Sequence, residues 1–136
     1  RSLHDVGDVR ERLRNRIFLL AEDNPVNRQI VVELLADVGA ETVTAADGHE
    51  ALACLAETPT RFDAVVMDLD MPGMDGYTAA EEIRRQSRFK TLPIVAMTAH
   101  SMAGERERCI AVGMNAHIAK PIDVGALYAT LARVLQ

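Results

Sequence analysis

The chain has 136 residues and a formal net charge of −5, with 49% hydrophobic, 26% charged and 4% aromatic residues. These values are typical of one globular domain that is long enough to bury a core. The negative charge, without aromatic residues interleaved with basic ones, argues against a nucleic-acid surface. No apolar run approaches the roughly 20 residues that span a bilayer, so we expect no direct membrane contact from this chain.

The N-terminal segment differs in composition from the rest of the chain. Apolar residues recur there at near-helical spacing, but Gly7 interrupts the pattern. We interpret residues 1–15 as a linker or the end of an upstream helix, and residues 16–136 as a single domain. Cys54 and Cys109 lack metal-ligand spacing, which indicates reduced thiols of a cytosolic protein.

From residue 16 onward, apolar runs alternate five times with helical patterns. Such continuous runs are typical of strands buried on both faces of a sheet, and we predict strands in RIFLLAED, ETVTAAD, AVVMD, LPIVAMTAH and AHIAKP. Each following helix has a residue suited to cap its N-terminus: Asn24 before Pro25, Asp47 with Glu50, Asp75, Ser101 and Asp123. The helix after Asp75 should extend to about Arg88. The alternation predicts an α/β fold, a five-stranded parallel sheet with five helices covering both faces.

Polar residues stand where the predicted strands end: Glu22 and Asp23, Asp47, Asp68, Thr98 and Lys120. Open parallel sheets bind ligands beyond the carboxyl ends of their strands. Asp47 is better explained as a helix cap. The other four strand ends bring an acid pair, an acid, a hydroxyl and an amine to one edge of the sheet.

This set of groups favours metal-assisted chemistry on a carboxylate. Two carboxylates about 4 Å apart repel each other by on the order of 4 kcal/mol at an effective dielectric near 20, which Lys120 or a divalent cation would offset. Oxygen ligands without His or Cys favour a hard ion such as Mg²⁺. An ionised Asp68 could therefore attack a phosphoryl group and form an aspartyl phosphate. Lys120, Thr98 and the metal would stabilise the transferring oxygens.

The same motifs resemble the receiver domain of two-component signalling, the phospho-acceptor domain of response regulators. AEDNPVNRQIVVELL and GMNAHIAKPI are most similar to receivers at the C-terminal end of hybrid sensor histidine kinases. The resemblance implies a flavodoxin-like doubly wound sheet in strand order 2-1-3-4-5, with Mg²⁺ as cofactor. The implied partner is a histidine phosphotransfer domain or the phosphohistidine of a kinase.

Further expectations follow from this resemblance. The isolated domain would not be an enzyme, apart from removing its own phosphoryl group, and would be a monomer or weak dimer. It would lie in the cytoplasm, in a parent hybrid histidine kinase that can be anchored in a membrane.

The resemblance also assigns the acidic residues. Asp68, in VVMDLDMPGMDG, corresponds to the phosphorylated aspartate. Glu22 and Asp23 correspond to the acidic pair, with Asp23 as the direct metal ligand. The backbone carbonyl of Asp70 would complete the metal coordination by the protein.

The remaining assignments concern the switch and the lysine. Thr98 resembles the switch hydroxyl and Lys120 the phosphate-binding lysine, with a cis peptide bond before Pro121. The family usually has Tyr or Phe at the position of His117, so an aromatic rotamer switch is in doubt. His100 stands two residues after Thr98, at a position that tunes the lifetime of the phosphoryl group.

Two other functions stay open. Asp68 and Asp70 after a strand also resemble the nucleophile motif of haloacid-dehalogenase-type phosphatases, in which the second Asp is the acid and base. However, Pro72 stands where those enzymes usually have Thr or Val, and the chain has no room for a cap domain. The second alternative is a receiver fold that binds partners without being phosphorylated, although every acceptor-site position holds a matching residue.

Overall fold

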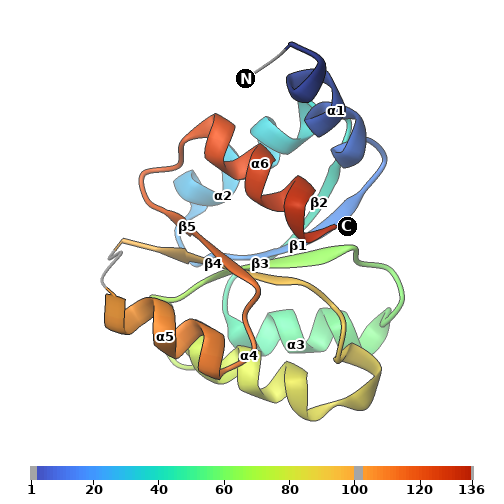
Figure 1. The fold of residues 1–136 in the computed structure, drawn as a ribbon. Helices are drawn as coiled ribbons and strands as arrows, with labels where there is room; N and C mark the ends of the chain where they lie inside the picture. The colour runs from blue at the N-terminus through green and yellow to red at the C-terminus, as the bar shows by residue number, and fades with distance from the viewer. Residues whose placement is uncertain (1–2, 100–102, 136) are drawn as a thin grey trace.

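The computed structural model describes residues 3–99 and 103–135. Its five strands form one parallel sheet in the order β2-β1-β3-β4-β5, which confirms the predicted flavodoxin-like order (Figure 1). The strands are β1 (Ile17–Ala21), β2 (Glu41–Ala45), β3 (Ala64–Asp68), β4 (Ile94–Thr98) and β5 (Ala116–Ala119). The two predictions for Ser101 and His100 lie outside the described residues.

The described residues form six α-helices, one more than predicted. They are α1 (Leu3–Leu13), α2 (Pro25–Ala36), α3 (Gly48–Glu57), α4 (Gly76–Arg85), α5 (Ala103–Ala111) and α6 (Val124–Val134), with a 3₁₀ turn η1 (Ser87–Phe89). The additional helix, α1, lies in the segment interpreted as a linker or the end of an upstream helix. The prediction that α4 reaches Arg88 is wrong, because Gln86 adopts extended backbone angles and ends the helix.

Side-chain caps begin four of the helices, as the sequence predicts. Asn24 accepts hydrogen bonds from the amides of Val26 and Asn27 at the start of α2. Asp47, Asp75 and Asp123 accept amide hydrogen bonds at the starts of α3, α4 and α6. A cap satisfies amides that have no partner within the helix. These four caps lie in the loops that follow β1, β2, β3 and β5.

The helices cover the sheet in two layers. In Figure 1, α1, α2 and α6 lie on one side of the sheet, and α3, α4 and α5 lie on the other. Each side has its own cluster of buried apolar residues, and both draw on the alternating side chains of the strands. All residues of β3 and β4 are buried. Both faces of these central strands are therefore covered, as expected for a parallel sheet.

The strand register brings the polar strand ends together. β1 ends with Ala21 paired to Met67, so the two residues after β1 lie beside the end of β3. Asp68 pairs with Met97, one residue before the end of β4. Close packing of α4 against this edge requires Gly76, since a Cβ atom there would lie 2.4 Å from the carbonyl oxygen of Asp68.

Candidate functional site

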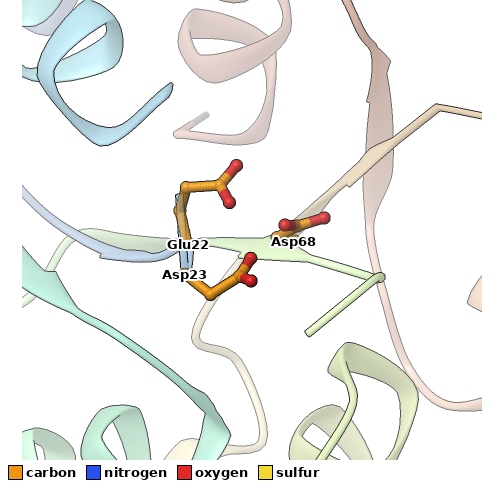
Figure 2. A group of neighbouring side chains, drawn as sticks. All are labelled: Glu22, Asp23 and Asp68. Atoms are coloured by element: carbon orange, nitrogen blue, oxygen red, sulfur yellow. The ribbon is translucent and has the colours of Figure 1, made fainter. Parts of the chain in front are cut away.

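Three carboxylates meet at the carboxyl edge of the sheet. Glu22 and Asp23 follow β1 and Asp68 ends β3, and their side chains converge in Figure 2. One oxygen of each lies within 4.8 Å of the others. Glu22 is 0% exposed and Asp68 is 1% exposed, whereas Asp23 is exposed. The site therefore contains two buried acids and one acid open to solvent.

Lys120 supplies positive charge to this cluster from the end of β5. Its Nζ atom lies 3.0 Å from Oδ1 of Asp68 and 3.2 Å from Oε1 of Glu22. Partial burial lowers the pKa of the ammonium, but the hydrogen bonds and charges of Asp68 and Glu22 outweigh this effect, so the pKa of Lys120 is raised. Lys120 is therefore charged at neutral pH. The following peptide bond, to Pro121, is cis, as the resemblance implies.

The two oxygens of Asp68 have different surroundings. Oδ1 accepts the amide hydrogen bond of Asp70 at 3.1 Å as well as the ammonium of Lys120. Oδ2 is buried and has no hydrogen-bond partner among the residues that the structure describes. A buried carboxylate oxygen without a partner is unfavourable unless something else satisfies it. Together with the oxygen-only donor set, this fits a hard divalent cation such as Mg²⁺.

Thr98 ends β4 on the neighbouring strand and is only 2% exposed. Its carbonyl accepts the amide of Lys120 at 2.8 Å, so its backbone is tied to the residue that pairs with Asp68. Its hydroxyl donates a hydrogen bond to Oε1 of Glu105 in α5. Glu105 could not be identified from the sequence, because GERERC indicates only a charged helix face.

Arg28 is a second residue that the sequence patterns missed. Its Nη1 atom donates to the carbonyl of Glu22 at 2.8 Å and to that of Asp23 at 3.1 Å. The amide of Asn24 donates to Oε2 of Glu22 at 3.0 Å. The signal in the sequence is the position of Arg28 four residues after the Asn24 cap, because helical side chains lean back toward the N-terminus.

Of the other predicted residues, Asp70 lies beside this cluster and His117 lies away from it. Asp70 is exposed, and its amide contacts Asp68. His117 is half-buried in β5 and lines a separate cleft of about 260 Å³ with Cys109, Ile110 and Arg133. The structure therefore does not place His117 among the acids.

A larger cleft opens directly beside the acids and the lysine. It has a volume of about 460 Å³ and is lined by Glu22 and Lys120 together with apolar groups, which include Ile30, Met97, Pro121 and Ile122. Val26 is 67% exposed nearby on α2, and Val124 is 43% exposed at the start of α6. An apolar surface thus adjoins the charged site.

The sheet order and the acid cluster with its paired lysine define a doubly wound α/β protein with a charged site at the carboxyl edge of its sheet. The chain belongs to the response regulator receiver domain family, whose profile matches residues 18–132. This match bears out the resemblance to two-component signalling proteins.

Individual relatives agree with this assignment. The chain is 43% identical over 122 residues to the sensor protein GacS of Pseudomonas syringae pv. syringae, covering 88% of this chain and 13% of GacS. It is also similar to the receiver domain of the Pseudomonas aeruginosa sensor histidine kinase PA1611, with 40% identity, a TM-score of 0.80 and coverage of 89% of this chain and 98% of that one. That receiver holds a magnesium ion in its active-site cleft.

A third neighbour is the receiver domain of Ssk1 from Saccharomyces cerevisiae, solved in complex with the histidine phosphotransfer protein Ypd1. It has 25% identity, a TM-score of 0.79 and coverage of 87% of each chain. The present chain spans only 12–13% of the length of the curated sensor kinases it matches. Within the residues that the structure describes, no helix is long and apolar enough to cross a membrane.

Proposed function

We propose that this receiver domain accepts one phosphoryl group on Asp68 from a phosphohistidine, in a reaction that requires Mg²⁺. The observation that carries the proposal is the pairing of the buried Asp68 with Lys120 at 3.0 Å, next to the carboxylates of Glu22 and Asp23. A carboxylate is itself a nucleophile and needs no general base to attack a phosphoryl group.

The transfer exchanges one bond to phosphorus for another. A carboxylate oxygen of Asp68 attacks the phosphorus, and the new O–P bond forms as the N–P bond to the donor imidazole breaks. The electron pair of the broken bond stays on the imidazole nitrogen, which takes up a proton from solvent. Lys120 remains charged and stabilises the phosphoryl oxygens, as cationic side chains do in phosphoryl transfer.

The residues that would hold the metal are Glu22, Asp23 and Asp68, with the backbone carbonyl of Asp70 as a further ligand. When bound, Mg²⁺ would neutralise negative charge on the phosphoryl oxygens and on the acids. Thr98 would donate its hydroxyl to a phosphoryl oxygen. Because a hydroxyl has a single donor hydrogen, this contact would replace its hydrogen bond to Glu105.

The proposed partner is a histidine phosphotransfer domain or a histidine kinase. The cleft beside Lys120 supports this proposal, because apolar groups on α2 and after β5 flank the acid site on the exposed edge. A partner that packs its own apolar helix there would present a phosphohistidine to Asp68. The Ssk1 complex with Ypd1 supports the same class of partner.

The proposal is tested by incubating the protein with acetyl phosphate and Mg²⁺ and measuring its intact mass. We expect the wild-type protein to gain the mass of one phosphoryl group and Asp68→Asn to gain none. Asp47→Asn is the matched control, since it changes another carboxylate at a strand end and Asn also caps helices. It should be phosphorylated like the wild type.

Two results would contradict the proposal. Equal incorporation by wild type and Asp68→Asn would show that the acceptor is another residue. Repeated turnover of a phosphate monoester would instead favour the haloacid-dehalogenase-type reaction.

A further inference from the structure

The loop that carries Glu22 and Asp23 is held by a side chain outside the acid cluster. The carbonyls of both residues precede α2 and receive their hydrogen bonds from one nitrogen, Nη1 of Arg28, at 2.8 and 3.1 Å. Each N–H of that nitrogen can serve one carbonyl. The guanidinium therefore bridges two consecutive peptide carbonyls, one on each side of the Asp23 Cα atom.

Arg28 is itself fixed at its backbone. Its amide donates to the carbonyl of Asn24 at 3.0 Å, and Asn24 caps α2 through its side chain. The amide of Asn24 also donates to Oε2 of Glu22. Asn24, Arg28 and Glu22 thus form a closed set of hydrogen bonds around Asp23.

Asp23 depends on this support more than the other acids do. Glu22 is buried and held by Lys120 and Asn24, and Asp68 is buried and held by Lys120 and Asp70. Asp23 is exposed, and it faces two carboxylates that repel it. Its position near them therefore has to come from its backbone.

We propose that Arg28 is a positioning residue for the metal site, holding the backbone of Asp23 so that its carboxylate stays within reach of Glu22 and Asp68. This inference rests on the proposed Mg²⁺-dependent function. Among the residues that the structure describes, the Arg28 side chain donates to the main-chain carbonyls of Glu22 and Asp23 and to no carboxylate. Arg28 therefore acts through the backbone.

The direction of the change in Mg²⁺ affinity when Arg28 is replaced distinguishes a positioning role from a purely electrostatic one. A guanidinium is positive, so by Coulomb's law alone its removal would strengthen binding of a cation nearby. Loss of the hydrogen bonds that position Asp23 would instead weaken binding of the cation. We expect Arg28→Met to weaken Mg²⁺ binding by about tenfold, the lower end of the range for residues that orient metal ligands.

The experiment is a calorimetric titration of Mg²⁺ into wild type, Arg28→Met, Arg28→Lys and Arg85→Met. Arg28→Lys keeps the charge and can still reach a carbonyl, so its affinity should lie between those of wild type and Arg28→Met. Arg85 is exposed on α4, and among the residues that the structure describes its side chain pairs with Glu82. Arg85→Met therefore controls for net charge and should bind like the wild type.

A second measurement keeps the test valid if a variant is less stable. Thermal unfolding of each metal-free variant establishes that it is folded at the titration temperature, and Arg28→Lys serves if Arg28→Met is not. Wild-type affinity or tighter binding in the folded Arg28 variants would overturn the inference while leaving the proposed function intact. A wild type that binds no Mg²⁺ would overturn both.

Discussion

The acid site has an excess of negative charge, because three carboxylates lie near the single ammonium of Lys120. Two of the carboxylates are buried, so water cannot screen them. This imbalance favours a cation at the site, and we expect it to lower the stability of the metal-free domain. The ammonium of Lys120 should reduce this destabilisation.

Replacement of Lys120 by Met tests this balance. At neutral pH in metal-free buffer, we expect Lys120→Met to lower the free energy of unfolding by about 3 kcal/mol, because Glu22 and Asp68 stay buried without a counter-charge. Urea unfolding followed by circular dichroism measures this difference.

The raised pKa of Lys120 determines how its contribution to stability depends on pH. A lysine whose pKa is raised in the folded state contributes its full stability below its ordinary pKa of 10.5 and loses it as the pH rises through the folded value.

Asp23→Asn is the matched opposite change, since it removes one repelling charge. It should raise the free energy of unfolding by about 1 kcal/mol after solvent screening is considered. A Lys120→Met protein as stable as the wild type at neutral pH would contradict this account.

At the scale of elements, α5 is the helix that is linked to the end of β4. Glu105, in its first turn, accepts the hydroxyl of Thr98. Its other end is tied to α4, where Arg84 donates twice to the carbonyl of Gly113 and once to the side chain of Asn115. A change at Thr98 therefore acts on a helix that is held at its far end.

Arg84→Met tests the hold at that end. Arg84 also donates to the carbonyl of Phe89, and burial lowers the pKa of its guanidinium. Removing it takes the side-chain donor away from the carbonyls of Gly113 and Phe89, so we expect a loss of about 2–4 kcal/mol in the free energy of unfolding. Arg85→Met, next to it but exposed, should change stability by less than about 0.5 kcal/mol. Equal effects of the two substitutions in urea unfolding would show that the contacts of Arg84 contribute nothing.

The sequence predicts most elements because strand and helix signals are local. Asn24, Asp47, Asp75 and Asp123 cap helices as expected, since a cap needs only its own side chain and the next few amides. The end of α4 was not predictable in the same way. Arg84 and Arg85 continue the helical pattern, and the extended backbone of Gln86 is not visible from propensity.

Residues of the site were predictable for a different reason. Polar groups at the ends of buried strands must share one edge of a parallel sheet, so the strand pattern alone groups Asp23, Asp68 and Lys120. Arg28 and Glu105 could not be grouped with them, because their contacts depend on the directions of helical side chains across a turn.

At the scale of the whole molecule, α1 lies in the helix layer that also contains α2 and α6, on one side of the sheet (Figure 1). Leu13 is 0% exposed within that apolar cluster. The amide of Asn15 donates to the carbonyl of Gly39 at 2.8 Å, which ties the end of the helix to the turn before β2. The guanidinium of Arg10 lies 5.7 Å from the ring centre of Tyr128 in α6.

These contacts predict that α1 folds with the receiver domain as one cooperative unit. Leu13→Ala should lower the free energy of unfolding of the whole domain by about 2–5 kcal/mol, the range for deleting a buried leucine side chain. Glu11→Ala, an exposed position on the same helix, should have little effect. If α1 were only a linker, both variants would unfold at the wild-type urea concentration. A shared shift for Leu13→Ala, measured both by circular dichroism and by tyrosine fluorescence, would show that a segment before β1 stabilises the sheet that carries Asp68.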